Sequence, residues 1–296
     1  MEVRPSGGGE VNMTVTTEPA SEVTGEAIAS NASRVLGETR PSTFGTDPHG
    51  EALDHELTRC GVRVIQAGHP AARTSTTITS PGRLGADTVD FRWDLAPTDV
   101  PACAHLHVGS LAVGRAQGAE DVAKLVSRQH PDTTISYDVS VRPSAMGLRD
   151  TAIARIDEMI SRSDIVKLSD GDLAWLRPGD RRGDAIRWLM SRGPAILVLT
   201  HGGTAATGFT RSGSVRVRGH RVEVVDTPEW EDAFMAGLLH ALTGRDLLAR
   251  RTDRRLRSIG LDDLRGILHH ANRFAARPIT SAGEEPPRTD ALAAAD

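Results

Sequence analysis

The feature that most constrains the fold is a series of short, apolar, strand-like runs with helical patterns between them. The clearest run is Ile196 to Leu199, and the preceding segment 184–193 carries its apolar residues at helical spacing. A strand that is apolar along its whole length is buried on both faces, and helices between such strands place them in a parallel sheet. The sequence therefore predicts an α/β fold, a Rossmann-like parallel sheet flanked by helices.

Helical and strand patterns continue along the rest of the chain. Further helices are predicted at 49–61, 119–129 and 150–163, and the polar segment 207–219 is predicted to form a hairpin. Asp184 is predicted as the N-cap of the helix that precedes the apolar run, because a short acidic side chain can accept from free backbone N–H groups.

Two segments with alternating polar and apolar residues predict a small, separate pair of strands. They are 74–80 and 87–95, and the turn-forming sequence PGRLGA (81–86) lies between them. Such strands would leave exposed edges in a monomer, and exposed edges are usually paired or covered. The sequence therefore predicts a homodimer formed through these strands.

Composition excludes several classes of protein. The chain has 296 residues and a net charge of −4, which favours neither nucleic acid nor an anionic membrane as a partner. Two cysteines, Cys60 and Cys103, cannot form a disulfide framework, and no apolar run approaches the ~20 residues of a membrane span. The start of the chain lacks the charged-then-apolar order of a secretion signal. We expect a cytoplasmic protein with a flexible segment at 1–22, one α/β domain at 23–287 and a flexible tail at 288–296.

Polar or glycine-containing segments follow the predicted strands. Because ligands of open α/β sheets bind beyond the carboxyl ends of the strands, these segments are expected to form one composite site. They are GSLA (109–112), DVSVRP (138–143), KLSDGD (167–172), THGGTA (200–205) and DTPEWED (226–232).

The order of these segments resembles the PfkB/ribokinase family of carbohydrate kinases, nearest its fructokinase-like bacterial branch. The resemblance covers roughly Gly25 to Pro287, and FGTDPHGEALDHELTRCGV resembles an early motif of the same family. It implies a ribokinase-like fold, in which the strands at about 74–95 belong to a small β lid. It also implies ATP and Mg²⁺ as cofactors and a sugar-like small molecule as the substrate.

The resemblance implies catalytic roles for the DTPEWED segment. Asp232 matches the family's base, which removes the proton of the acceptor hydroxyl. Glu229, Trp230 and Glu231 match the family's Gly-Ala-Gly, whose backbone N–H groups enclose the transferred phosphate as an anion hole. Asp226 matches an acid that is associated with a monovalent cation, so K⁺ is a further expected ion.

Other positions are matched to metal, nucleotide and substrate. Ser169 and Asp172 match a polar pair that helps to position Mg²⁺ through water. The nucleotide side is matched by Thr200, Gly202, Gly203 and Asn272, and the substrate side by Gly109, Asp138 and Arg142.

The chain departs from the family at both the anion hole and the sugar motif. Glycine permits unusual backbone angles and close approach of an anion, whereas Glu229 and Glu231 place carboxylates where a phosphate is expected. Two unit charges ~4 Å apart at an effective dielectric constant of about 20 repel by roughly 4 kcal/mol, or about three decades in rate. At the family's early glycine turn the chain has Gly25 alone, with Ile28 at the position of an asparagine and no clear first strand before it.

Two functional hypotheses follow. The first is ATP- and Mg²⁺-dependent phosphorylation of a sugar or sugar-like hydroxyl, impaired by the loss of the glycines. The second is a degenerate PfkB-like protein with a ligand-binding, partner-binding or non-phosphotransfer role. Asp232 by itself could also be an ordinary acid at a helix start, favoured by the helix dipole.

The apolar spacing of the segment after Asp232 predicts a helix. Phe234, Leu238 and Leu242 recur every four residues and Gly244 ends the run. We therefore expect the start of this helix to face the strand ends at 138 and 200.

Paired histidines are the remaining candidates for chemistry. His105 and His107 share one face of a predicted strand, and His269 and His270 are adjacent on a predicted helix. Neither pair has a third ligand at a metal-binding spacing, so both are interpreted as core or surface residues.

Overall fold

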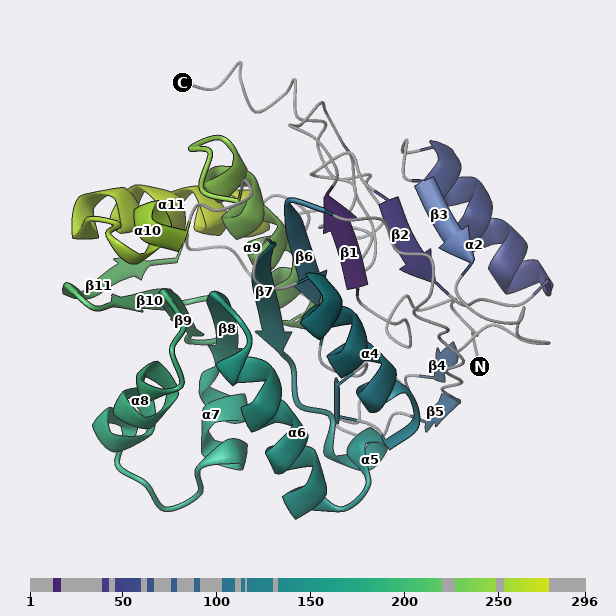
Figure 1. Ribbon diagram of the computed structural model, residues 1–296, viewed down its shortest axis with the longest axis horizontal. Helices are drawn as coiled ribbons and strands as arrows, with labels where there is room; N and C mark the ends of the chain where they lie inside the picture. Colours follow the sequence, from purple (N-terminus) through teal and green to yellow (C-terminus); the bar gives the residue numbers. More distant parts are fainter. Residues whose placement is uncertain are drawn as a thin grey trace.

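The computed structural model describes residues 13–16, 39–42, 46–59, 63–66, 76–78, 88–90, 103–109, 113–114, 116–129, 133–219, 227–248 and 253–276. These residues form a nine-stranded sheet of order β11-β10-β9-β8-β7-β6-β1-β2-β3 and a separate two-stranded sheet of β4 and β5 (Figure 1). The strands are β1 (Met13–Thr16), β2 (Thr39–Ser42), β3 (Arg63–Gln66), β4 (Thr76–Ile78), β5 (Thr88–Asp90), β6 (His105–Val108), β7 (Thr134–Val139), β8 (Ile165–Ser169), β9 (Ile196–Thr200), β10 (Ala205–Thr210) and β11 (Gly213–Arg218). The helices are α2 (Pro48–Arg59), α4 (Ala116–Gln129), α5 (Pro143–Met146), α6 (Arg149–Ser161), α7 (Asp170–Leu176), α8 (Arg182–Ser191), α9 (Thr227–Thr243), α10 (Asp253–Arg257) and α11 (Leu261–Ala275).

The centre of the large sheet is parallel, as the apolar runs predict. Strands β6, β7, β8 and β9 pair in parallel, with helices in the connections between them. Strands β10 and β11 extend this centre in antiparallel pairs, and β1 is antiparallel to β6. The antiparallel extension has a simple cause: only the turn 201–204 joins β9 to β10, and a parallel crossover needs a dozen or more residues.

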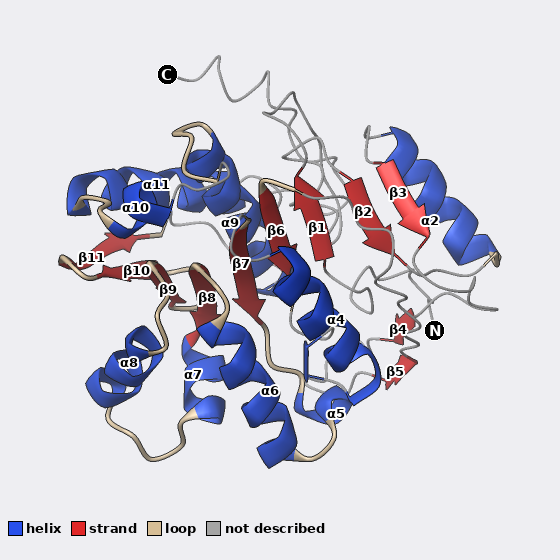
Figure 2. Cartoon of the chain, viewed as in Figure 1, coloured by secondary structure: helices blue, strands red, loops and turns tan. Residues whose placement is uncertain are grey.

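Helices cover both faces of the sheet, and each face has its own apolar core (Figure 2). On one face α4, α6, α7 and α8 contribute Leu125, Ile156, Leu173 and Leu189 to the same cluster as Leu197 of β9. On the other face α9 and α11 pack against β8 and β9, whose inward side chains there include Ile165 and Val198. The alternation of side chains along each strand thus assigns one set of residues to the face that α9 covers.

The small two-stranded sheet agrees with the predicted lid strands. β4 and β5 lie within 74–80 and 87–95 and pair antiparallel, with Thr77 opposite Val89. The homodimer expected through these strands stays a prediction, and light scattering at micromolar concentration would test it.

Two details differ from the sequence-based predictions. Helix α8 begins at Arg182 with Arg181 as its N-cap, so Asp184 lies in the first turn and the predicted cap is wrong. The Asp184 carboxylate instead accepts from Arg187 one turn later. No regular structure is predicted for 1–22, yet Met13–Thr16 form β1 opposite β6, because pairing with β6 stabilises a strand too short for its own pattern to reveal. The predicted division into one domain and two flexible ends stays a prediction.

In the part of the chain that the structure describes, no helix combines the length and the apolar character needed to cross a membrane.

Candidate active site

The start of α9 lies against the ends of the central strands, as predicted. Lys167 of β8 lies between two carboxylates, with its Nζ 3.0 Å from Asp138 Oδ2 of β7 and 2.8 Å from Glu231 Oε2 of α9. All three side chains are largely buried, with exposed fractions of 3% for Lys167, 8% for Asp138 and 16% for Glu231. The predicted position of the α9 start is therefore confirmed at the β7 strand end.

Strand β9, the neighbour of β8, also provides a hydrogen-bond donor to Glu231. The Thr200 hydroxyl, at the end of β9, lies 2.8 Å from each oxygen of the Glu231 carboxylate and donates its proton to them. Glu231 is thus bound by an ammonium and a hydroxyl from two adjacent strands. Its negative charge is paired within the protein, so the charge repulsion expected from the sequence is partly neutralised.

Sequence reasoning did not identify Lys167 as a site residue. The signal was present, since this is one of only two lysines in the chain and it lies between the apolar residues Val166 and Leu168 of a strand. A charge in such a strand needs a partner, because burying an unpaired ion costs several kcal/mol. The partners come from segments 29 and 64 residues away along the chain, and the local pattern does not reveal them.

Asp232 is buried beside this group, with 6% of its surface exposed. Burial raises its pKa well above the usual range, while the nearby Lys167 opposes the rise. Its Oδ2 has no hydrogen-bond partner among the described residues. A buried carboxylate with a raised pKa and a free oxygen is suited to act as a general base.

The buried charges around Lys167 influence one another. Burial raises the pKa of Asp138 to about 6, although attraction to Lys167 acts in the opposite direction. Burial alone would lower the pKa of Lys167, but the attraction of Asp138 and Glu231 outweighs it and raises the pKa. Lys167 is therefore a permanent cation at the centre of the group.

Ser169 and Asp172, predicted to assist Mg²⁺, form a capping box at the start of α7. Asp172 Oδ2 accepts from the Ser169 backbone N–H at 2.8 Å and from its hydroxyl at 2.6 Å, and Asp172 Oδ1 accepts from Val141 N at 2.8 Å. Burial raises the Asp172 pKa, and these hydrogen bonds oppose the rise. Both oxygens are already bonded, yet a carboxylate has about four acceptor positions, so the pair fits a hydrated Mg²⁺ that it contacts through water.

The described residues contain no group of three or more His, Cys, Asp or Glu side chains arranged to hold a metal ion directly.

The predicted nucleotide side is formed by the turn between β9 and β10 and by α11. Gly202 and Gly203 have φ angles of 55° and 71°, in the left-handed region that glycine adopts readily. Gly219 packs so closely that an added Cβ would lie 2.1 Å from the Gly203 carbonyl oxygen. Next to it, Asn272 of α11 directs its Nδ2 toward Arg218 O at 3.5 Å. The structure thus brings the glycine turn and Asn272 to the same end of β11.

The residues that replace the family's Gly-Ala-Gly differ in their surroundings. Trp230 is 3% exposed, and its ring lies 5.2 Å from that of Phe234 in the core beneath α9. Glu229 lies in the first turn of α9. The Glu229 side chain and the whole of Asp226 lie outside the described residues.

The other two predicted substrate residues lie beyond a strand and before a short helix. Gly109 is buried directly after β6, and the half-buried Arg142 precedes α5. The charge of Arg142 lowers the pKa of Asp232, after the larger effects of burial, Lys167 and Asp138, so the two side chains are near each other.

His105 and His107 are core residues, whereas His269 is exposed and His270 is half-buried, in agreement with the interpretation of the pairs as core or surface residues. His105 Nε2 and His107 Nδ1 each lie 2.8 Å from the Ser136 hydroxyl, and burial lowers the pKa of both rings to about 3. His270 pairs with His240 of α9, with 3.0 Å between ring nitrogens, and not with its neighbour His269.

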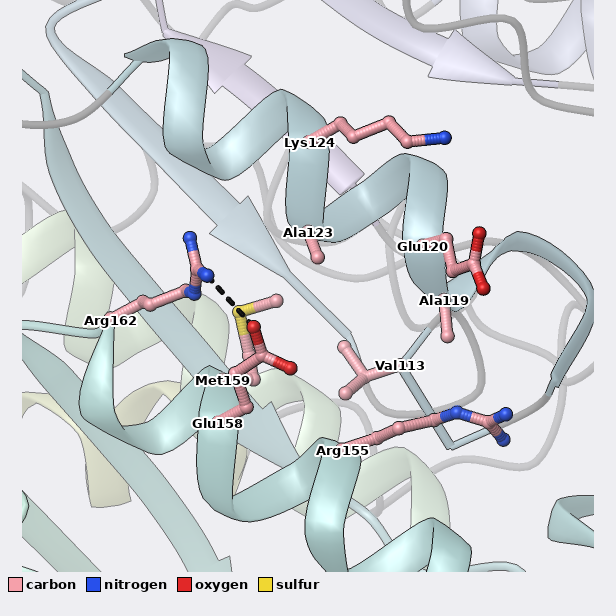
Figure 3. A pocket seen from close by; sticks show the side chains of 9 residues that line it. All are labelled: Val113, Ala119, Glu120, Ala123, Lys124, Arg155, Glu158, Met159 and Arg162. Atoms are coloured by element: carbon pink, nitrogen blue, oxygen red, sulfur yellow. Dashed lines mark hydrogen bonds and ion pairs between the residues drawn. The ribbon is translucent and has the colours of Figure 1, made fainter.

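A groove of about 350 Å³ lies apart from these residues, between α4 and α6 (Figure 3). Its apolar residues include Val113, Ala123 and Met159, and charged side chains such as Arg162 and Glu158 line its margin. None of the predicted site residues lines this groove.

The comparisons with known proteins agree with the geometry. The family model described as pfkB family carbohydrate kinase matches residues 24–283. The chain belongs to the pfkB family of carbohydrate kinases. This confirms the family inferred from the strand-end segments.

Curated relatives of this pfkB protein include several fructokinases. The chain is 37% identical over 150 residues to a fructokinase of Rhizobium leguminosarum bv. trifolii, a match covering 50% of this chain and 46% of that protein. It is 27% identical over 263 residues to a fructokinase of Klebsiella pneumoniae, with 83% of each chain covered. The first of these matches thus spans about half the length of the relative.

Solved structures of similar fold confirm the ribokinase-like α/β architecture. A double mutant of fructokinase from Vibrio cholerae O395, in its fructose-, ADP- and potassium-bound form, superposes with a TM-score of 0.76 at 20% identity, covering 91% of this chain and 89% of that one. Aminoimidazole riboside kinase from Salmonella enterica, bound to aminoimidazole riboside and an ATP analogue, gives a TM-score of 0.71 at 19% identity and 92% coverage of both chains.

Proposed function

We propose that this pfkB protein phosphorylates a sugar or sugar-like hydroxyl with ATP and Mg²⁺, and that its altered anion hole slows the transfer. The observation that carries the proposal is the position of Asp232, a buried carboxylate with a free oxygen in the second turn of α9. The chain differs from the family at the three residues before that aspartate and at the early sugar motif around Gly25 and Ile28.

In the proposed reaction Asp232 takes the proton of the acceptor hydroxyl. The hydroxyl oxygen then attacks the γ-phosphorus of ATP, the bond from that phosphorus to the β–γ bridging oxygen breaks, and ADP leaves. Backbone N–H groups at the start of α9 and the half-buried Arg142 would stabilise the charge that develops. Mg²⁺ would neutralise phosphate charge, and Ser169 and Asp172 would hold its water ligands.

Glu231 is the reason to expect slow transfer. Its carboxylate lies at the helix start where the family's glycine leaves room for phosphate, and it is bound to Lys167 and Thr200. An incoming phosphate would have to displace this carboxylate or bind close to it against charge repulsion. Either requirement raises the barrier relative to a site with glycine.

The identity of the acceptor is proposed from the relatives. Several of them are fructokinases, and one related structure holds fructose and ADP, so fructose is the first acceptor to test. We also propose that Asp226 lies near a monovalent cation site, which predicts faster turnover in K⁺ than in Na⁺.

The second candidate is a protein that binds nucleotide or a small ligand without transferring phosphate. It is favoured by Trp230, whose ring is part of the core and would not be expected in a turn that must move aside for phosphate. A paired experiment separates the two functions: calorimetric titration with ATP–Mg²⁺, then ADP formation over a panel of sugars. Binding with ADP formation that depends on one sugar supports the kinase, and binding without it for any sugar supports the second candidate.

A further inference from the structure

A chain of three side chains connects the predicted nucleotide turn to the predicted metal side. His201 Nδ1 lies 2.8 Å from Asp170 Oδ2, and His201 Nε2 lies 2.8 Å from Thr207 Oγ1. The imidazole is 7% exposed, so water competes little for either nitrogen. His201 is held at both ends by partners on two different elements, α7 and β10.

The hydrogen bonds fix the imidazole in one tautomer. A carboxylate can only accept, so His201 Nδ1 carries a proton and donates it to Asp170. In the neutral ring Nε2 is then an acceptor, and the Thr207 hydroxyl donates to it. Both nitrogens are used, and the ring cannot rotate without losing one of two part-buried hydrogen bonds.

The backbone of His201 anchors the glycine turn. Its N–H donates to Ala205 O at 2.9 Å, and its carbonyl accepts from the Thr204 backbone N–H at 3.2 Å and from the Thr204 hydroxyl at 2.6 Å. Gly202 and Gly203 lie inside this loop. A fixed His201 therefore fixes the two glycines that the family resemblance assigns to the nucleotide.

The other end of the chain is the first residue of α7. Asp170 immediately follows Ser169, and the capping box of Ser169 and Asp172 forms the same helix start. If His201 shifted, it would either pull the start of α7 with it or lose its hydrogen bond to Asp170. Ser169 and Asp172, which are proposed to hold the water ligands of Mg²⁺, belong to that helix start.

We propose that His201 is a positioning residue that keeps the glycine turn and the start of α7 in register, so that ATP and Mg²⁺ are bound as one unit. This inference rests on the proposed function, because it assigns His201 a role in binding the nucleotide of that same site. It predicts that the loss of His201 lowers the affinity for ATP–Mg²⁺ more than the affinity for ATP alone. A purely structural histidine would lower both equally.

The test compares calorimetric titrations with ATP in EDTA and with ATP in excess Mg²⁺ for four proteins. They are the wild type, His201→Ala, His201→Asn and Arg182→Ala. The asparagine amide nitrogen superposes on Nδ1 of histidine, so this variant keeps the donor to Asp170 and should restore most of the binding. Arg182 is the exposed second partner of the same carboxylate, and its removal serves as the matched control.

We expect His201→Ala to weaken ATP–Mg²⁺ binding about tenfold and ATP binding about twofold, with Arg182→Ala unchanged. Equal losses in both titrations, or an unchanged affinity in a folded His201→Ala protein, would overturn the positioning role while leaving the kinase proposal in place. If His201→Ala does not fold, Thr207→Val, which removes the partner of His201 Nε2, provides the same comparison of the two titrations. A wild type that binds no nucleotide at all would overturn both proposals together.

Discussion

The two ends of the candidate site differ in whether they retain the glycines of the family. At the nucleotide end, Gly202 and Gly203 adopt positive φ angles in a turn that is fixed by hydrogen bonds of His201 and Thr204. At the phosphate end, the positions of the family's Gly-Ala-Gly include Trp230, which replaces the alanine and is buried, and Glu231, which replaces the second glycine and is ion-paired. The nucleotide end keeps the glycine backbone that allows a ligand to approach closely. At the phosphate end, the side chains that replace the family's motif make contacts within the protein.

The difference shows how a substitution becomes part of the fold. Glu231 is compensated by the Lys167 ammonium and the Thr200 hydroxyl, and Trp230 by its contact with Phe234. These contacts make the phosphate end more stable in the absence of ligand. An anion that enters the phosphate end must therefore compete with these contacts, whereas the hydrogen bonds described at the nucleotide end hold the glycine turn in place. The predictions below test this contrast.

The largest effect is expected from Asp232→Asn, which removes the proposed base and keeps the shape of the side chain. Phosphotransfer should fall about 10²–10⁴-fold, the usual contribution of a general base. Initial rates of ADP formation, with thermal melting as the check on folding, measure this. Activity close to that of the wild type would mean that another group takes the proton.

Trp230→Ala should cost about 3–5 kcal/mol of unfolding free energy, because it empties a buried aromatic site beside Phe234. Trp230→Phe is the matched control and should cost far less. Urea unfolding measures both. A loss below about 1 kcal/mol for the alanine variant would show that the phosphate end is not packed as described.

At the nucleotide end, Gly202→Ala should destabilise the protein by about 1–2 kcal/mol, from backbone strain alone. An added Cβ would have open space around it, so no clash contributes. Gly202→Asn should lose less, because asparagine tolerates the left-handed conformation better. Unfolding curves and ATP–Mg²⁺ affinity, measured together, check this; equal losses for the two variants would point to a cause other than strain.

The smallest effect expected is on the pH dependence of the rate. Burial raises the pKa of Asp232, and the charge of Glu231 adds to the rise, so the base becomes protonated and activity is lost as pH falls through that raised pKa. Glu231→Gln removes one negative charge, lowers the pKa of Asp232 and should move the acid limb of the kcat profile toward lower pH. A shift in the opposite direction would show that Glu231 does not act on Asp232 through its charge.

Much of the fold could be predicted from the sequence because its signals are local. The apolar run 196–199 identified a buried strand, and the four-residue spacing from Phe234 to Leu242 identified α9. Asp184 was assigned wrongly as a cap because an acid in the first turn and an acid at the cap produce almost the same pattern. The strand β1 has only four residues and depends on its partner β6.

Most residues of the site could be predicted from the sequence, but the contacts between them could not. The strand-end rule placed Asp138, Thr200 and Glu231 together, and the structure confirms this. Lys167 was missed, and with it the pairing of the Glu231 charge, because ion pairs between distant segments leave no periodic pattern. The link from His201 to Asp170 was missed for the same reason, since the two residues are 31 apart in the chain.

The rate of ADP formation by Glu229→Gly/Glu231→Gly, compared with the wild type on fructose and a sugar panel, tests the central claim most directly. The double change returns glycine to the phosphate end, removes both carboxylates and frees the Lys167 ammonium to face the phosphate, while Trp230 stays in the core. Because Lys167 already neutralises part of the Glu231 charge, we expect a rise of about tenfold, equivalent to about 1.4 kcal/mol of barrier. A brisk wild type that the double change slows would contradict the account, since the two glutamates would then be working parts of the site.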